Sequence, residues 1–301
     1  MKKVLITGAT GFLGSHVVPL LREASFDVSA IVRGTRSCGK DIHEIVADLT
    51  NGKEMKSIET RMNDIDILIH LAAEMPKAGS SKEEQETLQT TQTEGLRHLL
   101  SILPPKIKHI VYASSIDVFG MPKSLPIDET HSTEPISEYG KAKIQGERIL
   151  QEFADRTGCA LTILRITQIY GKGEPKIKAI PLFIEKVAMG EAPVLFGDGS
   201  DERDYIEVSD AARSIMHALE HGANGTFVIA SGNTVTLKTV AEEIVRISGK
   251  KLELISKERQ KPKINFRFDV SKAKKLLGFE AKIPLSEGLQ MQYDASLRQM
   301  Q

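Results

Sequence analysis

The 301-residue sequence contains no tryptophan, only two cysteines and no excess of either charge. Forty basic side chains balance forty acidic ones, so nothing favours a nucleic acid, a membrane surface or another polyanion as a partner. Cys38 and Cys159 form no pair with metal-binding or redox spacing, which predicts free thiols, a reducing compartment such as the cytoplasm, and no metal site. No apolar run is long enough for a membrane span or a signal-peptide core. We therefore expect a small-molecule ligand.

Short runs rich in valine and isoleucine alternate with amphipathic stretches. The runs cover residues 4–7, 28–32, 65–71, 107–113 and 161–166, and helices are expected at 12–23, 82–103 and 137–156. This alternation indicates the α/β class, with a doubly wound parallel sheet of the Rossmann type covered by helices on both faces.

Three glycines spaced three apart, Gly8, Gly11 and Gly14, lie between the first run and the first helix. The first allows a tight turn, the second lets the backbone approach a pyrophosphate, and the third lets helix and strand pack closely. Helix N-terminal amides would face the anion. We therefore predict a dinucleotide site here, which also includes Thr10, Phe12 and Leu13.

Arg33 directly follows the second run, at the strand end where an acid would bind the ribose hydroxyls of NAD. An arginine there suits the extra phosphate of NADP, and Asp27 lies at the wrong end of the strand to replace the acid. NADP is therefore the favoured cofactor, with NAD possible. Further predicted cofactor contacts are Asp48 and Leu49 near the adenine, and Leu71, Ala72 and Ala73 beside a ribose.

Tyr139 and Lys143 lie four residues apart, which places them on one face of the expected helix. A cation beside a phenol favours the phenolate and brings it toward a useful range for proton transfer, and the lysine can also hold the nicotinamide ribose. Ser115 ends a strand at the same sheet edge as the glycine turn, so it can bind the same substrate oxygen. We predict these three residues as the catalytic group.

The sequence resembles the extended short-chain dehydrogenase/reductases, in their nucleotide-sugar epimerase and dehydratase branch. The resemblance runs through Gly8-x-x-Gly11-x-x-Gly14, Asp48, His70-Leu-Ala-Ala73, Ser114-Ser115, Val118-Phe-Gly120, Tyr139-x-x-x-Lys143, Leu164-Arg165, Tyr170-Gly171, Gly197-Asp-Gly199, Arg203 to Asp210, and Asp269 to Phe279. It implies that Tyr139 takes a proton from a sugar hydroxyl while a hydride passes to the nicotinamide, which gives a transient keto sugar. Return of the hydride to the opposite face would give an epimer.

The resemblance also implies substrate-binding residues. Arg203 would pair with the substrate diphosphate, and Gln168 stands where the family usually has a diphosphate-side asparagine. Asp117 occupies the place where some related dehydratases hold an acid. Family homodimers pair through helices that correspond to 82–103 and 137–156, so we expect a homodimer.

After Tyr170 the composition changes, and glycine, proline and charged residues become more frequent. We predict a dinucleotide-binding domain over residues 1–170, rejoined by 205–232, and a smaller C-terminal α/β substrate domain over 171–204 and 233–301. Two alternatives to the sugar-nucleotide enzyme stay open. One is an NADPH-dependent reductase of a small aldehyde or ketone, and the other is a regulatory protein that binds the dinucleotide without turnover.

Overall fold

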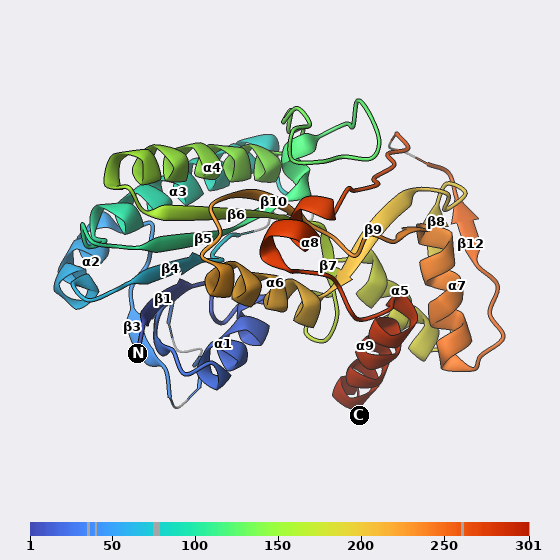
Figure 1. Ribbon diagram of the computed structural model, residues 1–301. Coiled ribbons are helices and arrows are strands. Elements are labelled where there is room, and N and C mark those ends of the chain that lie inside the picture. Colours follow the sequence, from blue (N-terminus) through green and yellow to red (C-terminus); the bar gives the residue numbers. More distant parts are fainter. Residues whose placement is uncertain (35–36, 40, 75–78, 260–261, 301) are drawn as a thin grey trace.

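A parallel sheet of seven strands forms the centre of the molecule, in the order β10-β6-β5-β4-β1-β2-β3 (Figure 1). The strands are β1 (Lys3–Thr7), β2 (Asp27–Val32), β3 (His43–Val46), β4 (Ile67–His70), β5 (His109–Ser115), β6 (Ala160–Ile166) and β10 (Gly225–Ile229). The computed structural model describes residues 1–34, 37–39, 41–74, 79–259 and 262–300. The predicted α/β fold of the Rossmann type is confirmed.

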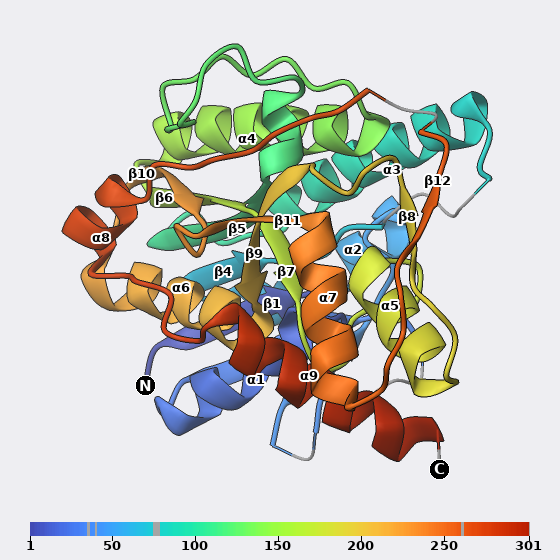
Figure 2. The ribbon, with the colours of Figure 1, turned by 90° about the vertical axis from the view of Figure 1, so that its right-hand side faces the viewer.

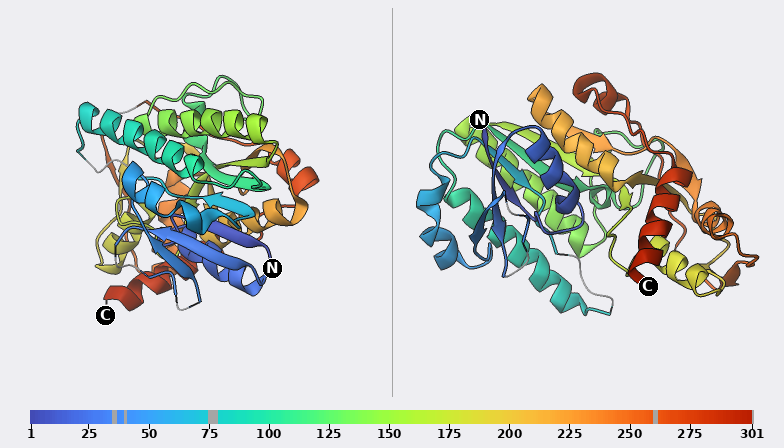
Figure 3. Two further views of the ribbon diagram at one scale, coloured as in Figure 1. Left: turned by 90° about the vertical axis from the view of Figure 1, so that its left-hand side faces the viewer. Right: turned by 90° about the horizontal axis from the view of Figure 1, so that it is seen from below.

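Helices cover both faces of the sheet, because its strands carry apolar side chains on both sides. One face packs against α1 (Gly14–Glu23), α6 (Val208–His221) and α8 (Ser271–Leu277). The other packs against α2 (Gly52–Ser57), the 3-10 helix η1 (Glu59–Met62), α3 (Lys82–Ser101) and α4 (Glu138–Thr157). The view from below shows α1 and α6 side by side on the first face (Figure 3).

Local signals set the ends of the two long helices. Ser81 and Glu84 form a reciprocal capping box at the start of α3, in which Ser81 Oγ accepts from the Glu84 amide at 3.1 Å. Ser137 Oγ accepts from the Gly140 amide at 3.0 Å at the start of α4, and Gly158 ends that helix at φ 74°. The first helix begins at Gly14 rather than residue 12, because residues 8–13 form the glycine turn.

A second group of elements surrounds its own apolar core, which contains Tyr170, Phe183, Val240 and Leu289 (Figure 2). It comprises β7 (Gln168–Tyr170), β9 (Glu202–Glu207) and β11 (Thr234–Thr236) in one sheet, β8 (Val194–Phe196) and β12 (Ile255–Lys257) in another, and helices α5 (Ala179–Ala188), α7 (Leu237–Ser248) and α9 (Leu285–Met300). Between β9 and α7 the chain returns to the large sheet as α6 and β10.

The strand order reverses beside β1, since β2 pairs with one of its edges and β4 with the other. At the carboxyl ends of neighbouring strands the register aligns Thr7 with His70, and His70 with Tyr112. Open α/β sheets bind ligands at such a switch point. The fold therefore predicts a ligand-binding site at the carboxyl ends of β1, β4 and β5.

Candidate active site

The turn between β1 and α1 requires its glycines. Gly8 has a φ of 75°, and a Cβ on it would lie 2.7 Å from the Ala72 amide nitrogen. A Cβ on Gly14 would lie 2.1 Å from the Gly8 carbonyl oxygen, so no larger residue fits without movement. No side chain caps the start of α1, and the amides of Ser15 and His16 are bonded to carbonyls of the turn itself. Among the described residues the amides of residues 12–14 have no hydrogen-bond partner, so these three are the ones available for an anion.

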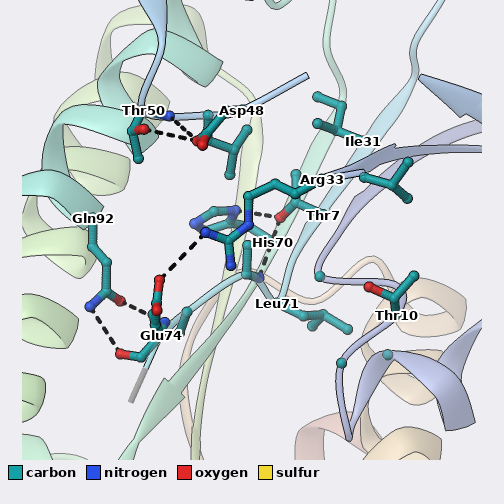
Figure 4. A pocket seen from close by; sticks show the side chains of 18 of the residues that line it. Thr7, Thr10, Ile31, Arg33, Asp48, Thr50, His70, Leu71, Glu74 and Gln92 are labelled. Carbon is teal, nitrogen blue, oxygen red and sulfur yellow. Dashed lines mark hydrogen bonds and ion pairs between the residues drawn. The ribbon is translucent and has the colours of Figure 1, made fainter. Parts of the chain in front are cut away.

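The turn opens into a pocket of about 480 Å³ at the switch point (Figure 4). The pocket is large enough for part of a nicotinamide dinucleotide, and it is lined by the glycine turn and the N-terminus of α1, as such a ligand requires. Twelve of the fourteen predicted cofactor residues line it, namely Gly8, Thr10, Gly11, Phe12, Leu13, Gly14, Arg33, Asp48, Leu49, Leu71, Ala72 and Ala73. The other two, Tyr139 and Lys143, are not among its lining residues and lie on α4.

An ion pair links two sides of this pocket. Arg33 Nη1 lies 3.4 Å from Glu74 Oε2, and both side chains are exposed (Figure 4). Gln92 on α3 fixes the backbone of Glu74, because its amide donates to the Glu74 carbonyl at 3.1 Å and accepts from the Glu74 amide at 3.3 Å. Asp48 caps its own turn by accepting from the backbone amide and the hydroxyl of Thr50, both at 2.9 Å. Glu74 and Gln92 were not predicted as site residues.

The predicted catalytic residues come from β5 and α4. Lys143 is buried, its Nζ donates to the Ala113 carbonyl at 2.7 Å, and it lies 5.6 Å from the centre of the Tyr139 ring. Burial lowers the pKa of Lys143 to about 8, while the carboxylate of Glu147 acts in the opposite direction. Burial also raises the pKa of Tyr139, as does the charge of Asp117. The phenol is thus protonated in the protein alone and depends on added positive charge to ionise.

Ser115 and Asp117 lie at the end of β5, where the chain enters the 3-10 helix η2 (Ile116–Phe119) that packs against α4. Ser115 Oγ accepts from the Asp117 amide at 3.1 Å and is half-buried. Burial raises the pKa of Asp117, and Lys178 opposes this shift. Within the described part of the chain, the Asp117 carboxylate makes no hydrogen bond or ion pair, so it is available for another group.

Lys143 packs against two stacked aromatic rings, those of Tyr112 and His70. His70 stacks on Tyr112 with ring centres 5.6 Å apart, and Lys143 Nζ lies 4.9 Å from the centre of the Tyr112 ring. Burial lowers the pKa of His70 to about 3, so its ring is neutral. Thr7 Oγ1 accepts from the Ala72 amide at 3.4 Å and is hydrogen-bonded to His70 Nδ1 at 2.7 Å.

A buried ion pair lies behind the catalytic strand and was not predicted from the sequence. Glu147 accepts from Arg165 Nε at 3.1 Å and from Arg165 Nη2 at 2.7 Å, and Ser114 Oγ donates to the same carboxylate at 2.5 Å. Arg165 also lies over the Phe119 ring at 5.1 Å. The spacing of Lys143 and Glu147 was the available signal, since residues four apart share a helix face.

The two remaining predicted substrate residues lie on β7 and β9. Gln168 is exposed, at the start of β7. Arg203 is half-buried, and its guanidinium donates to the Glu202 and Ile264 carbonyls and lies 3.7 Å from Asp201 Oδ1. Its position is therefore fixed by protein contacts.

The glycine turn at the switch point, with the half-buried phenol of Tyr139 and the buried ammonium of Lys143 nearby, defines an enzyme that uses a nicotinamide dinucleotide. Residues 4–230 match the model of the NAD dependent epimerase/dehydratase family. The sequence is 31% identical over 294 residues to a putative UDP-glucose 4-epimerase of Methanocaldococcus jannaschii, with 95% of each chain covered. The chain belongs to the NAD dependent epimerase/dehydratase family.

Solved structures of enzymes named as epimerases also resemble this chain over nearly its whole length. A UDP-glucose 4-epimerase of Thermotoga maritima, solved with UDP-glucose, has a TM-score of 0.90 at 29% identity, covering 99% of this chain and all of the other. A UDP-glucuronic acid 4-epimerase of Bacillus cereus, solved with UDP-glucuronic acid and NAD, has a TM-score of 0.86 at 26% identity, with 99% and 100% covered. Within the described residues, no helix combines the length and apolar character that crossing a membrane needs.

Proposed function

We propose that the protein epimerises a nucleotide sugar through a transient keto intermediate, with Ser115, Tyr139 and Lys143 as its catalytic residues. The observation that carries this proposal is the pair on α4 of a half-buried Tyr139 and a buried Lys143, with Lys143 Nζ bonded to the carbonyl of Ala113 on the strand that carries Ser115. A protein that only bound the dinucleotide would not need the phenol. The regulatory alternative is therefore the weaker one.

Bound at the glycine turn, the dinucleotide supplies a hydride acceptor and donor. Tyr139 Oη takes the proton from the sugar hydroxyl, and the Ser115 hydroxyl orients the same oxygen. Lys143 is charged below its pKa of about 8 and lies 5.6 Å from the centre of the Tyr139 ring, so it would act together with the positive charge of the oxidised nicotinamide to favour the phenolate.

The substrate class rests on the relatives, since several of them are named for UDP-sugar conversion. Arg203 and Gln168 would hold the diphosphate from β9 and β7. The protein contacts that hold the Arg203 guanidinium would pre-orient it, so less side-chain freedom is lost on binding. The predicted division at residue 170, with residues 205–232 rejoining the first domain, would put the sugar between the two domains.

The preference for NADP stays a prediction. Its support is Arg33, which borders the pocket at the end of β2 where an acid would bind the ribose of NAD. Relatives solved with NAD show the plain dinucleotide in their own sites. A competition experiment with both cofactors, repeated on Arg33→Asp, tests the point: a preference that is the same in both proteins would exclude Arg33 as its cause.

The first experiment is incubation of the purified protein with UDP-glucose, with UDP-galactose measured by proton NMR. Replacing Tyr139 with phenylalanine should lower turnover at least about 100-fold, the usual contribution of a placed acid or base, and leave dinucleotide binding intact. Tyr293→Phe on α9 is the matched control and should turn over normally. Normal turnover in Tyr139→Phe would refute the catalytic assignment. Net oxidation of NADPH by simple carbonyl compounds would instead favour the reductase.

A dehydratase is the second candidate, because Asp117 offers a half-buried carboxylate near Tyr139 that has no partner among the described residues. Such a carboxylate could remove the proton next to a keto group. Reaction in deuterium oxide distinguishes the two. Deuterium at the carbon beside the reacting one, lost in Asp117→Asn, would support dehydration, whereas pure epimerisation leaves that carbon unlabelled.

The cytoplasmic location and the homodimer also stay predictions. Both cysteines are unpaired, which suits a reducing compartment. Light scattering of the purified protein would test the dimer, and substitution of exposed residues on α3 and α4 should change the measured mass if those helices pair.

A further inference from the structure

Three side chains at the end of α6 bring metal-ligand atoms together. His217, Glu220 and His221 each offer one such atom, and these atoms lie within 4.8 Å of one another. Their spacing along the chain places all three on one face of the helix. Glu220 and His221 are exposed and His217 is half-buried, so an ion could reach them from solvent.

Hydrogen bonds fix both imidazoles in the form that binds a metal. His217 Nδ1 lies 3.0 Å from the Leu277 carbonyl oxygen, and His221 Nδ1 lies 3.0 Å from the His217 carbonyl oxygen. A carbonyl can only accept, so each Nδ1 carries the proton and, in the neutral ring, each Nε2 carries the lone pair. Histidines that bind metals usually donate their other ring nitrogen in this way.

The surrounding backbone also favours a cation. The helix α6 ends at His221 and α8 ends at Leu277, each followed by a left-handed glycine, Gly222 and Gly278. The carboxyl end of a helix carries partial negative charge. A Cβ on Gly278 would lie 3.4 Å from His221 Nε2, so this nitrogen faces the end of α8. The two helices are in contact (Figure 1).

We propose that His217, Glu220 and His221 bind a divalent transition-metal ion such as Zn²⁺, Ni²⁺ or Cu²⁺. Imidazole nitrogens suit these ions, and a carboxylate completes three protein ligands with water in the remaining position. Bonds of about 2.1 Å require the donor atoms to approach one another by roughly 1 Å, which the exposed side chains of Glu220 and His221 allow.

The site is structural rather than catalytic. The motif His217-x-x-Glu220-His221 has the spacing found in one class of zinc proteases, but here its residues do not line the dinucleotide pocket. A bound ion would instead hold His217 in the rotamer that bonds Leu277, and so hold the end of α6 against the end of α8. The prediction of no metal site rested on the spacing of the two cysteines, whereas the signal for this cluster is the spacing of His217, Glu220 and His221 along a helix.

The test is calorimetric titration of zinc chloride into the untagged protein. We expect one ion per chain, and binding weakened at least about tenfold in both His221→Asn and Glu220→Gln. His43→Asn on β3 removes an exposed histidine elsewhere and should bind zinc like the wild type. Zinc should also raise the melting temperature of the wild type and of His43→Asn, but not that of His221→Asn.

Two results would overturn the proposal. One is no binding at millimolar zinc, and the other is equal affinity in the wild type and in both cluster variants. Neither result depends on the proposed enzyme activity, since the titration needs no substrate or dinucleotide.

Discussion

Removal of the charge on Glu147 should destabilise the protein far more than removal of a charge from a similar pair at the surface. Glu147 and Arg165 form a bidentate ion pair, and their side chains are 6% and 9% exposed. In Glu147→Gln the guanidinium would stay buried without a counter-charge. Loss of one partner from a buried pair costs about 3–5 kcal/mol, because the remaining charge is desolvated and uncompensated.

The chain offers a matched control. Arg246 and Glu243 on α7 make the same two contacts, at 2.8 and 2.7 Å, but the arginine side chain is 69% exposed. In Glu243→Gln water can solvate the arginine, so we expect a loss of about 0.2–1 kcal/mol. The two variants therefore remove the same pair of arginine–carboxylate contacts in a buried and in an exposed setting, and Glu147 differs further by accepting from Ser114 Oγ.

Urea unfolding followed by far-UV circular dichroism is the suitable assay, since the protein has no tryptophan to report by fluorescence. A third variant, Glu147→Leu with Arg165→Met, replaces the pair with apolar side chains and should recover most of the loss. Equal losses in Glu147→Gln and Glu243→Gln would refute the reasoning. So would a double variant that is less stable than Glu147→Gln.

Three further predictions follow from the site and its surroundings. In a pH–rate profile, kcat/KM should fall as the pH rises through about 8, because Lys143 loses its charge there. Lys143→Arg should move this fall to higher pH, since arginine keeps its charge. A wild-type profile that stays flat to about pH 10 would contradict this prediction. Glu174 accepts from Gln292 at 2.8 Å, and burial raises its pKa to about 7. The contribution of Glu174 to the free energy of unfolding is therefore full below its ordinary pKa of about 4.3 and is lost as the pH rises through 7. Between about pH 5 and pH 7.5 the free energy of unfolding, measured by denaturation, should fall by up to about 3 kcal/mol more in the wild type than in Glu174→Gln. Equal falls in the two proteins would exclude the effect. Gly14→Ala should destabilise the protein by about 3 kcal/mol and abolish dinucleotide binding, because the added Cβ would meet the Gly8 carbonyl oxygen. Mass spectrometry of the dinucleotide that stays bound to the purified protein measures this. An unchanged amount in the variant would show that the turn can adjust.

The sheet could be predicted because its strands are buried on both sides and so appear as continuous apolar runs. β1, β2, β5 and β6 lie within two residues of their predicted bounds. β3 was missed, since three of its four residues are exposed and its sequence, His-Glu-Ile-Val, shows no run. Edge strands with one buried residue carry little signal in their sequence.

The dinucleotide pocket could be predicted because glycine spacing reflects local backbone geometry, which a short sequence determines. The Glu147–Arg165 pair could not, since it joins α4 to β6 and depends on how the two elements pack. The same holds for the Arg33–Glu74 pair across the pocket, whose partners come from the ends of different strands. Contacts of this kind require the tertiary structure.

The return of β10 to the large sheet has a consequence for synthesis on the ribosome. β10 pairs with β6 along its whole length, yet residues 167–224 lie between them in the chain. At the usual rate of roughly 5–20 residues per second, the outer edge of β6 stays uncovered for several seconds in the nascent chain. An apolar strand with a free edge can pair with other chains. A fragment that stops at residue 170 would keep that edge permanently open, so the cofactor-binding part of this protein should aggregate when it is expressed alone.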